Sequence, residues 1–257
     1  ALKHVRSEKD PYTLMRMIKV NILNCDKVLD QSIKNQTKNF FCVSTDKASN
    51  PVNMMGASKK IMELLAINKS DKIKVTSARF ANVLFSDGSL LHGFRQRILK
   101  SQPIVAPSDI KRYFISPRES GQLCLLSCVL GKNRDVFFPL LKENNQLQSF
   151  DKLAILFLKN IGHEPFICDS EEQARQLIKS NSLKNQWPCF FHKSDTSGEK
   201  PFEEFHTSKE KVNLSRFKNI GIIKNKSNIQ NEKIVLFKRE ILKLREQKNW
   251  SRIDMID

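Results

Sequence analysis

FFCVSTDKASNP, residues 40–51, and MGASK, residues 55–59, decide the fold. The apolar start of the first stretch predicts a buried strand, and Lys59 to Leu65 predicts an amphipathic helix. Asp46, Lys47 and Lys59 therefore gather where a strand is followed by a helix. In α/β proteins, binding and catalytic sites form at the carboxyl ends of strands. The segment thus marks the expected site as well as the fold.

Helical and extended patterns alternate along the first 150 residues. Apolar residues at helical spacing predict helices, and short apolar or β-branched runs predict strands. The expected helices cover residues 12–34, 54–68, 88–100 and 118–130, and the expected strands cover 40–44, 72–80, 103–105 and 135–140. This alternation predicts an α/β fold with a parallel sheet covered on both faces. Farther along the chain we expect helices at 150–161 and 170–178, a turn at 195–201 and a charged helical tail at 231–249.

Composition limits the class of protein. The chain has 257 residues, 44 Lys and Arg against 27 Asp and Glu, and a formal net charge of +17. The positive charge is scattered and is not interleaved with aromatic residues, so we favour a compositional bias over a nucleic-acid-binding surface. No apolar run is long enough to predict a membrane segment. The cysteines form no Cys-x-x-Cys pair and the histidines are dispersed, which predicts a reduced, cytoplasmic protein without a metal site.

The central segment by itself leaves two interpretations open. In a turn, Asp46 and Lys47 can both reach one pocket, and Lys59 lies on the same helix face as Met55. A lysine held in such a pocket can bind a ribose or change the ionisation of a neighbour. The same residues also fit a solvated surface turn, which is the usual place of Lys and Asp. Spacing alone does not separate a site from a surface turn.

Several motifs together resemble one family. The string STDKAxNPVNxMGASK at 44–59 resembles the nucleotide-sugar 4,6-dehydratases of the extended short-chain dehydrogenase/reductase superfamily, in the polysaccharide-biosynthesis branch that includes UDP-N-acetylglucosamine 4,6-dehydratases. Further similar stretches are ALKHV at 1–5 with the downstream Asn21, RFANVLFSDGS at 79–89, PI at 103–104, DIKRYF at 109–114 and GEKxxEE at 198–204. They occur in the order in which the family has them.

The resemblance implies a dehydration in which NAD(P) carries a hydride within one turnover. It makes Lys47 the base at the sugar C5 and Asp46 the acid at the departing hydroxyl. Thr45 would hydrogen-bond the reacting sugar hydroxyl. Lys59 would hold the nicotinamide ribose, with Met55 beside the cofactor.

The resemblance also implies a set of substrate contacts. It places Lys3, Asn82, Ile104 and Glu199 at a nucleotide-sugar substrate, with Ile104 at the base. Many relatives carry an arginine just before the GEK motif, where this chain has Thr and Ser at 196–197. Uridine and guanosine nucleotides therefore both stay open. The full-length protein is expected to be a homo-oligomer.

Two departures from the family pattern shape the prediction. Met55 stands where the wider superfamily has Tyr, and a thioether cannot exchange the C4 hydroxyl proton. The Gly-rich turn that cradles a dinucleotide pyrophosphate is not found in this chain. We therefore predict a partial Rossmann-type parallel sheet without its N-terminal strands. Residues 1–145 would be the C-terminal part of an NAD(P)-binding domain with the catalytic segment, and 146–257 a smaller mixed substrate-binding region with a charged helical tail.

The function expected from the sequence is a 4,6-dehydratase that forms a 4-keto-6-deoxy sugar nucleotide for polysaccharide or glycan synthesis. The chain would be a piece of a longer protein and inactive alone. One alternative is a sugar-nucleotide 4-epimerase of the same superfamily, which Met55 disfavours. Another alternative is a non-catalytic basic binding or assembly protein. The net charge and the missing Gly-rich turn support this alternative.

Overall fold

The computed structural model describes residues 2–3, 8–141, 147–180, 183–194, 204–226, 231–247 and 249–255. The chain folds into two compact units built from interleaved segments. The first unit contains Ala1–Phe80, Gly121–Leu140 and Glu204–Asp257, and the second contains Ala81–Ser120 and Leu141–Glu203. The sequence predicts one domain boundary, after residue 145. In the structure, residues 146–257 contribute to both units. As a division between cofactor and substrate regions this boundary stays a prediction.

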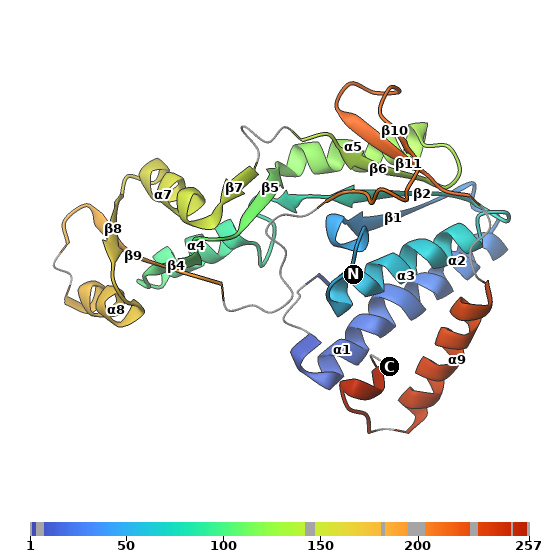
Figure 1. The fold of residues 1–257 in the computed structure, drawn as a ribbon, viewed down its shortest axis with the longest axis horizontal. Coiled ribbons are helices and arrows are strands. Elements are labelled where there is room, and N and C mark those ends of the chain that lie inside the picture. Colours follow the sequence, from blue (N-terminus) through green and yellow to red (C-terminus); the bar gives the residue numbers. More distant parts are fainter. Residues whose placement is uncertain are drawn as a thin grey trace. The chain divides into compact units, whose positions relative to one another are not determined.

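The first unit is built on a five-stranded sheet of order β1-β2-β6-β11-β10 (Figure 1). The strands are β1 (Asn39–Thr45), β2 (Lys74–Phe80), β6 (Asp135–Pro139), β10 (Val212–Asn213) and β11 (Ile220–Lys224). β1, β2 and β6 run parallel, with Ser44 opposite Arg79 in the register, and β11 runs antiparallel to β6. Thr45 and Phe80 thus end neighbouring strands at the carboxyl-terminal edge of the sheet, formed by the carboxyl ends of its parallel strands. This is where α/β proteins place their sites.

Helices cover both faces of this sheet. α2 and α3 lie on one face and α5 on the other (Figure 1). The helices of the first unit are α1 (Pro11–Ile18), which continues through a π-helical turn (Lys19–Asn24) into α2 (Cys25–Lys34), then α3 (Met54–Asn68), α5 (Pro117–Leu130) and α9 (Asn231–Glu246). The short helices η3 (Asp46–Ala48) and η4 (Ile253–Met255) complete it. Asp10 and Asn53 explain where α1 and α3 begin, because their side chains accept the amide protons of Thr13 and Gly56.

The charged tail helix α9 is part of the first unit. Its apolar residues Ile234 and Ile241 are buried in one cluster with Leu14 and Ile18 of α1 and Leu65 of α3. The ammonium groups of Lys69 and Lys238 both contact the carboxylate of Asp26, which ties α9 and the end of α3 to α2. An apolar stripe and ion pairs to the buried Asp26 therefore hold a helix in which half of the residues are charged.

The second unit carries two small sheets. One is parallel, of order β4-β9-β8, and the other has the order β3-β5-β7, with β7 antiparallel to β5. The strands are β3 (Asn82–Val83), β4 (Ile104–Pro107), β5 (Lys111–Ile115), β7 (Leu147–Ser149), β8 (Glu164–Cys168) and β9 (Gln186–His192), and the helices are α4 (Leu90–Leu99), α7 (Phe150–Asn160) and α8 (Glu171–Ser180). α4 and α7 pack on the β4 sheet around Phe94, Ala154 and Leu158.

The predicted α/β class is confirmed, with a mainly parallel sheet in the first unit. Beyond β6 the sheet continues with β11, an antiparallel strand. The strands β3, β5, β7, β8, β9, β10 and β11 were not predicted. Among the helices of the described chain, none combines the length and the apolarity needed to cross a membrane. The expected turn at 195–201 lies outside the described residues.

Candidate functional site

The predicted acid and base lie in a tight turn directly after β1. Thr45 ends the strand in an extended conformation, and its hydroxyl accepts the amide of Lys47 at 3.4 Å. Asp46 is buried, and its Oδ1 accepts from the Thr45 hydroxyl at 2.7 Å, from the Lys47 amide at 2.8 Å and from Lys47 Nζ at 3.3 Å. Three donors, one of them the Lys47 ammonium, therefore hold one oxygen of the Asp46 carboxylate in place.

The turn of η3 is named the catalytic turn, after the roles predicted for Asp46 and Lys47. The first turn of α3 packs against it because residue 56 is glycine. A Cβ at Gly56 would lie 2.6 Å from the carbonyl oxygen of Lys47, a distance that side-chain carbons do not tolerate. Asn53 accepts the amide of Gly56 at 2.9 Å and thereby fixes the start of the helix. The glycine in the MGASK motif thus sets how closely the helix approaches Asp46 and Lys47.

Lys59 reaches back from α3 to the strand. Its side chain is buried, and Nζ donates to the carbonyl of Val43 at 2.9 Å. Burial lowers the pKa of Lys59 from its ordinary value. Burial also raises the pKa of the neighbouring Cys42 thiol to about 12, so this thiol is not a nucleophile near neutral pH. The structure therefore brings Thr45, Asp46, Lys47 and Lys59 to one edge of the sheet, as predicted.

A π-helical turn positions the segment that carries Lys3. Asn21 lies in this turn and is buried. Its Oδ1 accepts from the amide of Leu2 at 2.8 Å, and its Nδ2 donates to the carbonyl of Leu2 at 2.9 Å and to the Ser58 hydroxyl at 3.0 Å. Single π-helical turns are frequent at functional sites. Asn21 therefore connects the backbone next to Lys3 with the residue next to Lys59.

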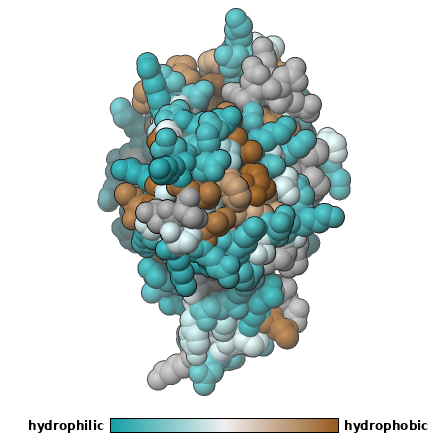
Figure 2. Space-filling model, turned by 90° about the vertical axis from the view of Figure 1, so that its left-hand side faces the viewer, coloured by the Kyte–Doolittle hydropathy of each residue, from teal (hydrophilic) through white to brown (hydrophobic). Residues whose placement is uncertain are grey.

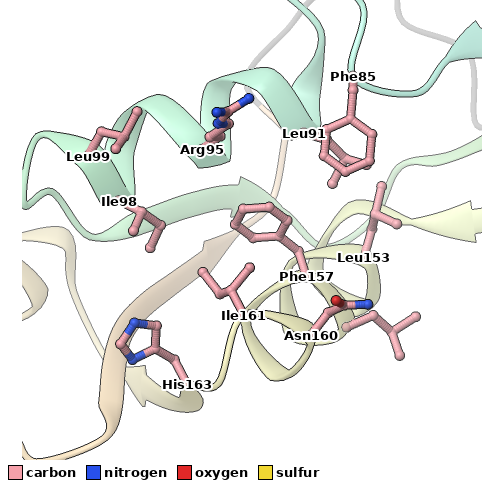
Figure 3. Close-up of a pocket in the computed structure, with 11 residues that line it drawn as sticks. Phe85, Leu91, Arg95, Ile98, Leu99, Leu153, Phe157, Asn160, Ile161 and His163 are labelled. Atoms are coloured by element: carbon pink, nitrogen blue, oxygen red, sulfur yellow. The ribbon is translucent and has the colours of Figure 1, made fainter.

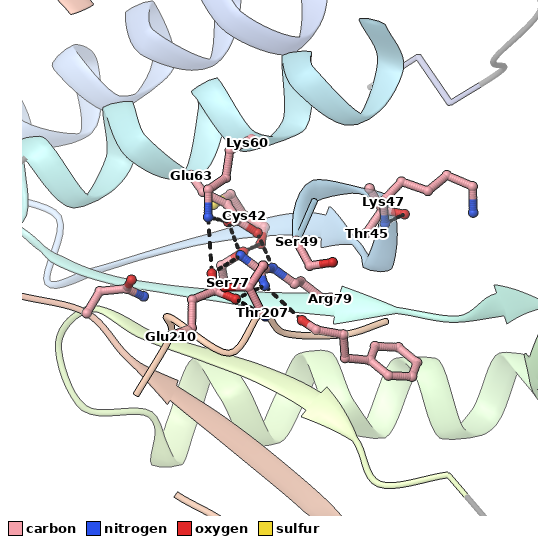
Figure 4. Close-up of polar contacts among 12 residues, drawn as sticks. Cys42, Thr45, Lys47, Ser49, Lys60, Glu63, Ser77, Arg79, Thr207 and Glu210 are labelled. Atoms are coloured by element: carbon pink, nitrogen blue, oxygen red, sulfur yellow. Dashed lines mark hydrogen bonds and ion pairs between the residues drawn. The ribbon is translucent and has the colours of Figure 1, made fainter. Parts of the chain in front are cut away.

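A buried ionic cluster lies behind the catalytic turn (Figure 4). Arg79 pairs with Glu63 through Nε and Nη2 at 3.0 and 2.8 Å, and with Glu210 through Nη1 and Nη2 at 2.9 and 2.8 Å. Its Nη1 also donates to the carbonyl of Phe205 at 2.8 Å. These bonds use all five donors of the guanidinium. They join β2, α3 and the segment from Glu204 to Glu210 into one body.

The charges of the cluster stabilise one another. Burial alone would raise the pKa of Glu210, but the hydrogen bonds and charge of Arg79 outweigh burial and lower it to about 2. Burial would likewise lower the pKa of Arg79, but the two carboxylates raise it. Both groups are therefore charged at neutral pH. The Ser49 hydroxyl, just after the catalytic turn, adds a bond to the carbonyl of Glu204 at 2.6 Å.

The predicted substrate residues are not all tested by the geometry. Asn82 and Ile104 belong to the second unit: Asn82 donates to the carbonyl of Tyr113 at 3.2 Å, and the Ile104 side chain is fully buried in the core. Lys3 is exposed. Glu199 lies outside the described residues, and the substrate roles of all four stay predictions.

Two side chains at the sheet edge fit the expected cofactor. The hydroxyl of Ser44 is buried and has no hydrogen-bond partner within the described part of the chain, so it can still bond a ligand. The ammonium of Lys59 has protons beyond the one given to Val43. Hydroxyl and amine donors of this kind suit the ribose of a dinucleotide. Met55 is buried and packs as an apolar residue at the start of α3.

Sequence reasoning missed the residues that support the site. Asn21 and Glu63 are polar residues on otherwise apolar helix faces, and this could have marked them as buried and bonded. Glu210 gave no comparable signal, because its partner Arg79 is 131 residues away in the sequence. Among the described residues, no group of His, Cys, Asp and Glu is arranged to hold a metal ion.

Comparisons with known proteins show the family of the chain. The polysaccharide biosynthesis protein family matches residues 1–225. The UDP-N-acetylglucosamine 4,6-dehydratase (inverting) of Campylobacter jejuni is 27% identical over 190 residues, which are 70% of this chain and 54% of that protein. The UDP-glucose 4-epimerase of Rickettsia canadensis is 33% identical over 129 residues, 48% of this chain and 38% of that protein.

A solved structure shows the same fold. The X-ray structure of Pen from Bacillus thuringiensis matches with a TM-score of 0.69 at 22% identity, covering 87% of this chain and 63% of that one. The chain spans about half or less of the length of the curated relatives it matches. The match over residues 1–225 shows that the chain belongs to the polysaccharide biosynthesis protein family.

Proposed function

We propose that the full-length protein is an NAD(P)-dependent nucleotide-sugar 4,6-dehydratase that acts on a UDP- or GDP-linked N-acetylhexosamine. The observation that carries the proposal is the turn after β1, in which the Asp46 carboxylate and the Lys47 amine lie 3.3 Å apart at the edge of the sheet. Dehydration across C5 and C6 needs one base and one acid that act on neighbouring atoms of the same sugar.

The ion pair is one proton transfer away from the required forms. Movement of a proton from Lys47 Nζ to the Asp46 carboxylate gives a neutral amine and a carboxylic acid. The amine then takes the C5 proton while the acid protonates the hydroxyl that leaves C6 as water. The elimination leaves the ammonium and the carboxylate. The ammonium would then return a proton to C5, and the proton released from the C4 hydroxyl would restore the starting charges of the pair.

The remaining residues of the site bind and orient. A bound NAD(P)⁺ supplies the reversible acceptance of a hydride that makes the C5 proton acidic. Ser44 and Lys59 would hold its ribose, and the Thr45 hydroxyl would hold the C4 hydroxyl of the sugar. Lys3 and Asn82 are proposed to contact the substrate. The 257-residue chain alone is expected to show little or no activity, and the full-length enzyme is expected to be a cytoplasmic homo-oligomer.

The test uses the full-length protein with NAD⁺ and UDP-N-acetylglucosamine, followed by proton NMR. A dehydratase replaces the C6 hydroxymethyl signals with a methyl doublet. Asp46→Asn and Lys47→Ala should each lower the rate of formation of this product at least about a hundredfold, which is the usual contribution of a general acid or base. Glu204→Gln changes an exposed carboxylate of the first unit and serves as the control. Bound cofactor without a methyl product would overturn the proposal.

The second candidate is a 4-epimerase, and the identity to the Rickettsia canadensis enzyme favours it. An epimerase returns the hydride to C4, so the C6 hydroxyl survives and the C4 configuration is inverted. The same spectrum separates the two, because the epimerase product keeps its C6 hydroxymethyl signals and changes its C4 proton couplings. A basic, non-catalytic binding protein would show neither product and would bind DNA in a salt-dependent way.

A further inference from the structure

The second unit has a large apolar groove between α4 and α7 (Figure 3). Its volume is about 770 Å³, within the range of pockets that take small molecules. Leu91 and Ile98 of α4 and Leu153 and Phe157 of α7 face one another across it, as Figure 3 shows. Eight of the eleven lining residues are hydrophobic: Phe85, Leu91, Ile98, Leu99, Leu153, Leu156, Phe157 and Ile161.

The rim of the groove exposes apolar side chains that the core of the unit does not use. Phe85, Leu99 and Leu156 are 56%, 68% and 57% exposed, although each is large and hydrophobic. In Figure 2 hydrophobic surface is likewise bordered by hydrophilic residues. Contiguous apolar exposure of this kind marks a binding surface in soluble domains.

Phe85 adds a second observation. Its φ is +55°, in the left-handed region that favours glycine, and it is both bulky and exposed. A phenylalanine there costs backbone energy and gains no burial. Strained residues persist where they serve a ligand or a partner. The ring of Phe85 lies at the lip of the groove, beside Leu91 and Leu153 (Figure 3).

The polar residues of the groove set the charge of its occupant. They are Arg95, Asn160 and His163, so the lining contains a cation and no carboxylate. Within the described chain Arg95 has no ion-pair partner, and its side chain is exposed on α4. The Nδ1 atom of His163 is buried and has no hydrogen-bond partner among the described residues. A ligand with an anionic head would give the Arg95 guanidinium the partner it lacks.

We propose that this groove binds a single-chain amphiphile, an unbranched alkyl chain with an anionic head group, with the chain between α4 and α7 and the head at Arg95. The apolar walls match the chain, and the lone cation with its neutral neighbours matches the head. This site lies entirely in the second unit and is independent of the proposed dehydratase chemistry.

The protein contains its own reporter of binding. The rings of Trp187 and His163 lie 5.2 Å apart, so a ligand that reaches His163 changes the surroundings of the indole. Trp250 is the only other tryptophan, and Trp250→Phe leaves Trp187 as the sole indole emitter. The probe is dodecyl phosphate, titrated below its critical micelle concentration into this variant of the 257-residue chain. The expected result is a saturable change in fluorescence.

Three comparisons make the test specific. Arg95→Gln should weaken dodecyl phosphate binding about tenfold, because one charge-assisted hydrogen bond contributes about this much to affinity. The same variant should leave the weaker binding of uncharged dodecyl maltoside unchanged. Leu156→Gln should weaken both probes, because it places an amide in the apolar wall. Leu125→Gln, at an exposed apolar position of α5 outside the groove, is the matched control and should change neither.

Other results would overturn the inference. Equal affinity for the two probes, or an affinity that Arg95→Gln leaves unchanged, would remove the head-group argument. A dimer in light scattering that Leu156→Gln dissociates, with no saturable binding of dodecyl phosphate, would show that the groove receives a second copy of the chain. Circular dichroism of each variant confirms that the fold is kept.

Discussion

The ionic cluster of Arg79, Glu63 and Glu210 makes a quantitative prediction about stability. Glu210→Gln keeps the shape of the side chain and removes the charge that Arg79 and Lys60 contact. The pKa of Glu210 is lowered from its ordinary 4.5 to about 2, which corresponds to about 3 kcal/mol of folding free energy at neutral pH. The variant should be less stable than the native chain by about this amount, because Arg79 stays buried with one carboxylate fewer.

The pH dependence of this difference has a definite sign. A carboxyl group whose pKa is lowered by folding stabilises the native state fully above its unfolded pKa. That stabilisation is lost as the pH falls toward the folded value. For Glu210 the window lies between pH 4.5 and about 2. The difference between the native chain and Glu210→Gln should therefore shrink from about 3 kcal/mol at pH 7 to about 2 kcal/mol at about pH 3.5.

The assay is urea unfolding followed by the fluorescence of Trp250, in a Trp187→Phe background. Trp250 reports on the first unit, because its indole donates to the carbonyl of Pro11. Glu204→Gln removes an exposed carboxylate from the same segment and should change stability by less than about 0.5 kcal/mol. If Glu210→Gln and Glu204→Gln behave alike at pH 7, or if the difference does not shrink in acid, the cluster does not stabilise the fold as argued.

Three further predictions follow from single contacts. Gly56→Ala should lower the free energy of unfolding by about 1–3 kcal/mol, because the added Cβ meets the Lys47 carbonyl. Gly93→Ala, in an open part of α4, should raise it by about 0.5–1 kcal/mol. The midpoints of urea unfolding compare the two variants. The Cys42 thiol, with its pKa of about 12, should resist iodoacetamide at about pH 8 in the native chain and react in urea, as mass spectrometry can show. Burial lowers the pKa of Lys59, so the native chain should gain stability relative to Lys59→Met as the pH rises toward 10.5; equal differences at about pH 7 and pH 10 would contradict this.

Local sequence was enough for the elements around the catalytic turn. The apolar run before Ser44 and the helical pattern at 54–68 placed β1 and α3 within a residue or two of their observed limits. The single helix expected over 12–34 is also present, but its π-helical turn was not foreseen. That turn places Asn21 against Leu2 and Ser58, and such contacts depend on the folded chain and not on the local pattern.

Pairing between distant segments explains the rest. β11 joins the sheet through antiparallel bonds to β6, about 80 residues earlier in the chain, and no local pattern specifies that partner. The same holds for the bond between Ser49 and the carbonyl of Glu204, 155 residues away. Motif resemblance identified the residues that carry the expected chemistry. It did not identify those that hold them in place, because their partners come together only in the folded state.

The helix α3 explains how the site tolerates methionine at position 55. Gly56 lets the helix approach the catalytic turn, Ser58 bonds Asn21, and Lys59 bonds the strand at Val43. These contacts leave Met55 buried against the protein as an apolar residue without a part in proton transfer. The groups that can move protons are instead Asp46 and Lys47, whose own side chains form a pair at 3.3 Å. In the proposed dehydratase this pair would act as the acid and the base on the sugar.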